Sequence, residues 1–357
     1  MTKEEQLAQE LQQKFNEMEN VKVKIALLGQ PGAGKSSLIN SLLGRKLFEV
    51  GVHTDTTTEK QEARFEEIDI VDLPGYGTKA FPFELWKERF APEQYDLYLF
   101  VFEGKLHDTD AQLFESLKEW KQERNHPYFI VRNKSDQIWD DEKSLSELKD
   151  AIRTDVYSKM GDRTADVFFT SCRDKSGLAE LKEAIFGANI PEVKKSKLVA
   201  AFKAETMEDL NRKKRVCLDK VDSYAYMCAL NGINPIPGVD VGIDIGILNK
   251  LMDEIRIVFG LDDEEKLEKY KFMLPAAKGL VEKVLQYTTV YGTTNVIKKM
   301  ALQFIGKKPL KVVPFVGQAI SAISGYMMTQ YLGKEYIDTC YELTKLVLED
   351  VIKKQNK

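Results

Sequence analysis

Gly29-Gln30-Pro31-Gly32-Ala33-Gly34-Lys35-Ser36 is the stretch that decides the fold of this chain. It consists of a glycine, four further residues and then Gly-Lys-Ser, and it follows the apolar run 21–28, which predicts a strand. An amphipathic helical pattern begins near Lys35. A glycine-rich turn between a strand and a helix can point successive backbone N–H groups at a phosphate, at the positive end of the helix dipole. The stretch therefore predicts a phosphate-binding loop.

This phosphate loop supplies most of the predicted nucleotide contacts. Lys35 is expected to reach the outer phosphates, and the hydroxyl of Ser36 is expected to bind Mg²⁺. The residues of the loop and first helical turn that we expect to contact the nucleotide are Gln30, Gly32, Ala33, Gly34, Lys35, Ser36 and Ser37.

The choice of base is predicted by Asn133-Lys134-Ser135-Asp136, which follows a strand-like run at 128–131. Asp136 can accept hydrogen bonds from N1 and the exocyclic amine of guanine, which adenine does not present together. The stem of Lys134 can cover the base, and Asn133 can tie this segment to the phosphate loop. Ser171 and Cys172 directly follow the last predicted strand, where a backbone N–H can meet the guanine O6. These residues predict a GTP and GDP site.

A metal-linked switch is predicted by Asp72-Leu73-Pro74-Gly75, which ends the strand-like run 68–71. Asp72 can hold Mg²⁺ through water, and the Gly75 N–H can meet the γ-phosphate. In the polar loop 51–58, Thr56 is the first choice and Thr57 the second for a ligand that binds Mg²⁺ only when the third phosphate is present. The predicted catalytic residues are Lys35, Thr56, Asp72 and Gly75, and the predicted metal ligands are Ser36, Thr56 and Asp72.

Tyr76 follows Gly75 and is an aromatic residue rather than a water-positioning glutamine. We therefore expect Mg²⁺-dependent GTP hydrolysis that is slow in the isolated protein, with water placed by a backbone group, a switch residue or a partner.

The apolar runs along the chain predict an α/β P-loop GTPase domain with a Ras-like, mostly parallel sheet over residues 21–190. Strand-like runs at 68–71, 97–102, 128–131 and 167–170 alternate with helical patterns at 109–123 and 143–159. Residues 191–357 read as an all-α helical domain. The apolar stripe in residues 1–20 predicts an N-terminal helix that packs on this helical domain, so the GTPase domain is expected to be inserted into it.

The charge and the cysteines of the 357-residue chain indicate which partners and which cellular compartment to expect. Residues 1–191 hold 26 Lys and Arg against 35 Asp and Glu, a net charge of −9, which predicts no nucleic-acid partner. The four cysteines form no CxxC pair, and residues 1–5 show neither an apolar signal core nor a Met-Gly start. We expect a cytoplasmic protein whose thiols are small apolar residues, Cys172 included.

The uncharged run 312–333 allows two interpretations. Its polar residues favour a helix buried in a bundle, whereas its length and the lysines that precede it keep a membrane-inserted or membrane-lying hairpin open. Asn234-Pro235-Ile236-Pro237-Gly238 and Val313-Pro314-Phe315-Val316-Gly317 are matching breakers, each before an apolar helix. The basic cluster 212–215 is expected to be a solvated helix face.

These residues resemble the translation-factor-related GTPases, and the whole chain is similar to the immunity-related GTPase family, in its lysine-containing Gly-Lys-Ser branch. The likeness rests on Asp72-Leu73-Pro74-Gly75 continuing through Phe81-Pro82, on Ile236-Pro237-Gly238 with Phe259-Gly260-Leu261-Asp262, and on 313–317. The resemblance implies slow basal hydrolysis, GTP-dependent homodimers or oligomers through the nucleotide face, and action at intracellular membranes in defence.

The chain differs from this family at three positions. Gln30 and Thr54 stand where the family often has glutamates that support activation across a dimer, and Asn133 stands where threonine is common. If the family's dimer contact operates here, the side chain of Gln30 is expected to face the partner. Two other interpretations stay open: a GTP-sensing interaction module with vestigial hydrolysis, and an RNA- or ribosome-associated GTPase.

Overall fold

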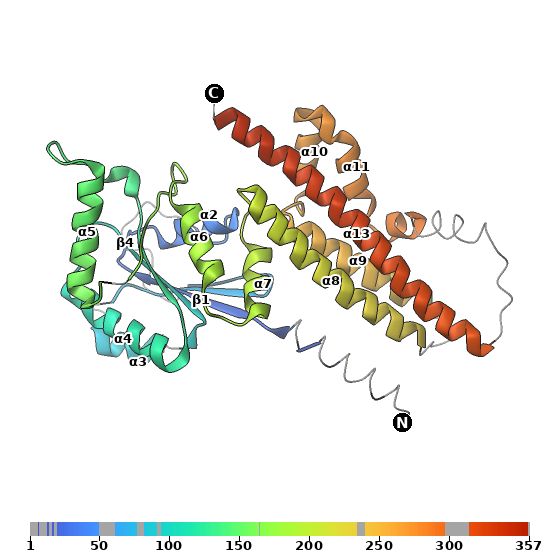
Figure 1. The fold of residues 1–357 in the computed structure, drawn as a ribbon, viewed down its shortest axis with the longest axis horizontal. Helices are drawn as coiled ribbons and strands as arrows, with labels where there is room; N and C mark the ends of the chain where they lie inside the picture. The colour runs from blue at the N-terminus through green and yellow to red at the C-terminus, as the bar shows by residue number, and fades with distance from the viewer. Residues whose placement is uncertain are drawn as a thin grey trace. The chain divides into compact units, whose positions relative to one another are not determined.

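The computed structural model describes residues 20–49, 61–76, 82–90, 94–163, 165–233, 240–296 and 314–355, with Gln6, Gln13, Asn16 and Glu17. The side chains of residues 230–244 and 314–324 lie outside this description. The chain divides into one compact unit of residues 20–203 and a second that contains residues 204–357 (Figure 1). The helix expected within residues 1–20 and its packing lie outside the described residues.

The first unit is built on a six-stranded sheet with the order β2-β3-β1-β4-β5-β6. All neighbouring strands are parallel except β2 and β3, which pair in antiparallel fashion. The strands are β1 (Val23–Gly29), β2 (Gln61–Phe65), β3 (Ile68–Asp72), β4 (Leu97–Phe102), β5 (Tyr128–Arg132) and β6 (Val167–Phe169). The predicted α/β fold with a mostly parallel sheet is confirmed. Strand β2 was not predicted, because this edge strand is mostly exposed and polar and has no apolar run.

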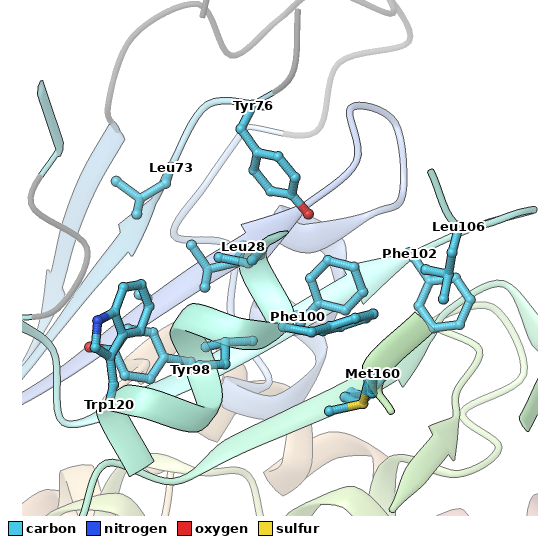
Figure 2. Close-up of a cluster of buried hydrophobic side chains, with 14 of the residues drawn as sticks. Leu28, Leu73, Tyr76, Tyr98, Phe100, Phe102, Leu106, Trp120 and Met160 are labelled. Atoms are coloured by element: carbon cyan, nitrogen blue, oxygen red, sulfur yellow. The ribbon is translucent and has the colours of Figure 1, made fainter. Parts of the chain in front are cut away.

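Helices cover both faces of the sheet, as continuous apolar strands require. Alternate residues of β1 point to opposite faces, so that Ala26 and Leu28 join a core with α3, α4 and α5. Figure 2 shows part of this core, with Leu28, Phe100 and Trp120 among the labelled side chains. The opposite face packs against α2, α6 and α7. The helix bounds are α2 (Lys35–Leu43), α3 (Phe83–Phe90), α4 (Asp108–Arg124), α5 (Leu145–Met160), α6 (Leu178–Gly187) and α7 (Glu192–Ala201).

The connections of the sheet change direction at the carboxyl ends of β1 and β3. Strand β1 leads into α2 on one face, whereas β3 leads into α3 on the other. Loops that leave neighbouring strands in opposite directions open a ligand crevice between them. The register pairs Leu27 with Asp72, so the end of β3 lies beside the start of the phosphate loop.

Helix α7 belongs to the first unit, although it lies beyond the predicted boundary at residue 190. Leu198 and Phe202 are buried, and the Lys203 N–H donates to Leu42 O at 2.8 Å. The unit therefore ends at residue 203. A charged sequence such as that of α7 gave no local sign of which unit it would join.

The second unit is helical throughout its described part, which confirms the all-α prediction for this region. Helices α8 and α13 run side by side along much of their length. They approach closely because Gly333 has no side chain: a Cβ there would lie 2.5 Å from Val221 Cγ2. The bounds are α8 (Met207–Ile233), α9 (Asp240–Val258), α10 (Glu264–Met273), α11 (Lys278–Gln286) and α13 (Pro314–Gln355).

The uncharged run 312–333 forms the start of α13 from Pro314 onward, so the predicted breaker 313–317 begins this helix instead of preceding it. Proline is tolerated there because the first helical N–H groups have no intrahelical acceptor. Thr329 and Leu332 are buried, as the bundle interpretation requires. Within the residues that the structure describes, no helix combines the length and apolarity needed to cross a membrane. The other breaker, 234–238, lies outside the described residues.

The prediction that 212–215 form a solvated face is wrong for Lys213. This side chain is buried, and its ammonium donates to Val258 O at 2.6 Å, at the carboxyl end of α9. A cation is favoured there because the last carbonyls of a helix lack intrahelical donors and carry partial negative charge. Lys214 pairs with Asp338 at 2.7 Å.

Gly177→Ala is expected to lower the free energy of unfolding of the first unit by about 3 kcal/mol or more. The residue has a φ of +68°, and a Cβ would lie 1.9 Å from Phe169 O. Gly104→Ala is the matched control: its φ is +80°, but a Cβ there meets no atom within 4 Å. The control should lose only the backbone term of about 1–2 kcal/mol. Urea unfolding measures both, and equal losses would contradict the steric argument.

Candidate nucleotide site

The phosphate loop turns sharply between β1 and α2, and its glycines are required by their surroundings. Gly29 has a φ of +120°, and a Cβ there would lie 2.0 Å from Val101 O. Gly34 has a φ of +85° and is the N-cap of α2, and its Cβ would meet Asn133 Nδ2 at 2.5 Å. No larger residue fits these positions without displacing backbone or Asn133. The loop therefore keeps its backbone open toward the amino end of α2.

Lys35, Ser36 and Asp72 lie together at the carboxyl ends of β1 and β3. The Ser36 hydroxyl donates to Asp72 Oδ2 at 2.8 Å, and Lys35 Nζ lies 3.8 Å from Asp72 Oδ1. Lys35 Nζ also donates to the carbonyls of Gly29 at 3.4 Å and Gln30 at 3.3 Å. Lys35 is 5% exposed and Asp72 is 1% exposed, so the two charges lie in the interior.

Burial disfavours the charged forms of both Lys35 and Asp72. Removal from water lowers the pKa of Lys35, and the nearby Asp72 carboxylate opposes that shift. Burial likewise raises the pKa of Asp72, against the opposing effects of Lys35 and of the Ser36 hydrogen bond. The attraction between Lys35 and Asp72 therefore does not fully offset the cost of removing the two charges from water. A phosphate beside Lys35 and a cation beside Asp72 would each favour the charged form.

The same residues fit a divalent cation. Asp72 Oδ1 is buried and accepts no hydrogen bond from the described part of the chain. The Ser36 hydroxyl, which keeps lone pairs while it donates to Asp72, lies beside that carboxylate. Hydroxyl and carboxylate oxygens are the ligands that Mg²⁺ prefers, either directly or through water. Thr56, the third predicted ligand, lies outside the described residues, as do Thr54 and Thr57.

Asn133 connects the base-reading segment to the phosphate loop. Its Nδ2 donates to Ala33 O at 2.9 Å and Gly34 O at 3.4 Å. Its Oδ1 accepts from Thr170 Oγ1 at 3.2 Å and from Cys172 Sγ at 3.7 Å. The buried amide thus holds the segments after β1, β5 and β6 together. Thr170 was not among the predicted site residues, and its place at the end of the last strand was the available signal.

Asp136 and Lys134 lie on the short turn after β5. The Asp136 side chain is 15% exposed, with the guanidinium of Arg173 at 4.0 Å. Lys134 has a left-handed backbone with a φ of +52°, and its ammonium pairs with Glu103. The stem of Lys134 passes within 4.0 Å of the place where a Cβ on Gly34 would lie. The Lys134 side chain therefore lies close to the phosphate loop, while the contacts of Lys134 and Asp136 with a base remain predictions.

The loop after β6 refines the prediction for Ser171 and Cys172. The Ser171 N–H donates to Ser176 O at 3.0 Å, and its hydroxyl accepts from the N–H groups of Arg173 and Asp174. Ser171 thus shapes the loop, which leaves the N–H of Cys172 as the predicted donor to the guanine O6. Burial raises the pKa of the Cys172 thiol, so the thiolate that redox chemistry needs is disfavoured.

The segment after β3 rests on the phosphate loop. A Cβ on Gly75 would lie 2.8 Å from Pro31 Cγ, and Trp86 Nε1 donates to Pro74 O at 2.8 Å. Tyr76 is buried, and its hydroxyl donates to Asp110 Oδ1 at 2.6 Å. The Gln30 amide donates to Lys105 O at 3.0 Å and to Asp110 Oδ2 at 3.2 Å. Gln30 therefore has contacts within the chain. The resemblance had instead predicted that its side chain faces a partner.

A family model described as interferon-inducible GTPase matches residues 2–351 of this chain. The chain belongs to the interferon-inducible GTPase family. Two mouse proteins are similar along most of their length. Interferon-gamma-inducible GTPase 10 is 23% identical over 94% of this chain and 83% of its own. T-cell-specific guanine nucleotide triphosphate-binding protein 2 is 24% identical over 91% of this chain and 81% of its own.

The GTPase unit alone is similar to bacterial proteins. Probable GTP-binding protein EngB of Thermotoga maritima is 30% identical over 46% of this chain and 86% of its own. Among solved structures, a probable GTP-binding protein engB has 20% identity and a TM-score of 0.35, over 46% of this chain and 98% of its own. The fold assignment rests on the strand order described above. Membership in the interferon-inducible GTPase family makes this chain a GTPase, with guanine nucleotide as its ligand.

Proposed function

We propose that this interferon-inducible GTPase hydrolyses GTP slowly with Mg²⁺, self-associates in the GTP state, and acts in the cytoplasm at intracellular membranes in defence. The observation that carries the chemistry is the buried cluster of Lys35, Ser36 and Asp72 beside the glycine-rich loop. The family and its interferon-induced mouse relatives support the role in defence.

Each residue of the site has a separate role toward the phosphates, the metal ion or the base. Lys35 and the N–H groups of the loop stabilise negative charge on the transferring phosphoryl group. Ser36 and Asp72 would hold Mg²⁺, which when bound would neutralise charge on the outer phosphates. Gly75 offers its N–H to the γ-phosphate, and Asp136 selects guanine. Thr56 is proposed to complete the metal site when GTP is present.

Slow basal hydrolysis is supported by the position of Tyr76. Its ring lies in the core beside Phe83 and Trp86, and its hydroxyl is bonded to Asp110, so the side chain is not available to orient a water molecule. This observation also favours a second candidate, a GTP-sensing module in which hydrolysis is vestigial. The two candidates differ in whether a partner raises the rate.

We expect the specific activity of the wild-type protein to rise about tenfold or more with protein concentration, since a partner molecule can order groups that the isolated site lacks. The activity is measured as phosphate release at about 0.5–50 μM protein, with Mg²⁺ and with a chelator. Analytical ultracentrifugation with GDP and with a non-hydrolysable GTP analogue gives the oligomeric state. A specific activity that stays flat would exclude activation by self-association.

Membrane action is tested separately by co-sedimentation with anionic and neutral liposomes in the same two nucleotide states. We expect the bound fraction to increase with the GTP analogue. An equal, low bound fraction in both states would remove the membrane part of the proposal and leave the GTPase part intact.

A further inference from the structure

Asp110, in the first turn of α4, lies outside every motif that predicted the nucleotide site, yet it contacts two of them. Its carboxylate is 1% exposed and accepts three hydrogen bonds. A buried carboxylate is costly unless its oxygens are satisfied. One bond, from the His107 N–H at 2.7 Å, begins the helix. The other two donors come from elsewhere in the chain.

The second donor is the Gln30 amide of the phosphate loop, at 3.2 Å from Asp110 Oδ2. Gln30 also donates to Lys105 O at 3.0 Å, so its amide joins the phosphate loop to the loop before α4 by two bonds. The backbone carbonyl of Gln30 accepts from Lys35 Nζ at 3.3 Å. A shift of Gln30 would therefore move an acceptor of the lysine that is predicted to act on the outer phosphates.

The third donor is the Tyr76 hydroxyl, at 2.6 Å from Asp110 Oδ1. Burial, and then the adjacent Asp110 carboxylate, hold the pKa of Tyr76 well above its usual value, so the hydroxyl keeps its proton and donates. Figure 2 shows the Tyr76 ring extending toward Leu28 and Phe100. Tyr76 directly follows Gly75, where an added Cβ would lie 2.8 Å from Pro31 Cγ of the phosphate loop. Its anchoring therefore fixes the backbone next to the predicted γ-phosphate donor.

We propose that Asp110 is a positioning residue for GTP hydrolysis, which holds the phosphate loop through Gln30 and the Gly75 segment through Tyr76. One buried carboxylate thereby sets the spacing of the two loops that act on the γ-phosphate. The role predicts that loss of this linkage slows the chemical step and leaves GDP binding intact, because GDP has no γ-phosphate. The inference rests on the hydrolysis of GTP and is independent of self-association.

Tyr76→Phe and Gln30→Met each remove one donor to Asp110 and preserve the His107 contact that begins α4. Asp110→Asn keeps the shape of the side chain but removes the negative charge that strengthens the bonds from Gln30 and Tyr76. We expect each variant to lower the single-turnover rate about tenfold, the scale of one hydrogen bond to a charged group, with GDP affinity within about twofold of wild type. Rates are measured with excess protein below the self-association concentration, and GDP affinity by fluorescent nucleotide titration.

The double variant Tyr76→Phe/Asp110→Asn separates positioning from general packing. Because both changes act on the same linkage, its loss of rate should be smaller than the product of the two single losses. Tyr98→Phe is the matched control, since it removes a buried tyrosine hydroxyl from the same core, where that oxygen accepts from the Tyr95 N–H at 3.4 Å. Its single-turnover rate should match wild type.

The proposal is overturned if the rate and GDP affinity fall together, if the double variant multiplies the two losses, or if Tyr98→Phe slows hydrolysis equally. If Asp110→Asn does not fold, the double variant of Tyr76→Phe and Gln30→Met takes its place. Its single-turnover rate should then be within about twofold of the rate of the slower single variant. Unchanged rates in both single variants would also overturn it.

Discussion

Lys35→Met is expected to slow GTP hydrolysis by about 10³-fold or more. The methionine keeps most of the apolar stem but removes the ammonium that lies between the carbonyls of Gly29 and Gln30 and the Asp72 carboxylate. Single-turnover phosphate release measures the loss, with nucleotide affinity recorded in parallel.

Lys182→Met is the matched control for the removal of a buried lysine. Lys182 is buried on α6, and its ammonium donates to Lys203 O at 3.0 Å. This change should lower the free energy of unfolding by about 1–3 kcal/mol and leave the rate of hydrolysis within about twofold of wild type. A Lys35→Met protein with the wild-type rate would mean that hydrolysis takes place elsewhere or in a contaminant.

Asp136→Asn is expected to weaken GTP binding by about 10²- to 10³-fold and to create affinity for xanthosine triphosphate. The carboxylate accepts from two N–H groups of guanine, whereas an asparagine amide would oppose the exocyclic amine with a donor. Xanthine carries a carbonyl at that position, so the same amide can donate to it. Competition of both triphosphates against a fluorescent guanine nucleotide gives the two affinities.

Asp140→Asn, four residues further along, controls for the loss of a negative charge in this region. Asp140 is exposed, and its Oδ1 accepts from the N–H groups of Glu142 and Lys143, which an asparagine oxygen can also do. This variant should bind GTP like wild type. Equal nucleotide preference in the Asp136→Asn protein and wild type would show that another residue reads the base.

Local sequence patterns were sufficient for much of the GTPase unit. The apolar runs gave the five parallel strands within one or two residues of their ends, because a strand covered on both faces must be continuously apolar. Asp263, the N-cap of α10, accepts from the Lys266 N–H at 3.0 Å. A cap interacts with backbone only three residues away, so the local sequence determines it.

Contacts between distant segments could not be predicted in this way. Lys213 looked like part of a solvated basic cluster until α9 placed the Val258 carbonyl beside it. Asp110 looked like an ordinary acidic residue in a first helical turn. Strand β2 exists because β3 offers it an open edge, although its own residues are largely polar.

The sequence alone thus determined the phosphate loop, the five parallel strands and the segment predicted to read guanine, because each depends on residue types at fixed short spacings. Asn133 was even expected to reach the phosphate loop, which it does. The tertiary structure decided what the residues between the motifs do. Asp110 receives Gln30 and Tyr76 from 80 and 34 residues away, and only the folding of β1, β3 and α4 around one sheet edge brings these three side chains within hydrogen-bond distance.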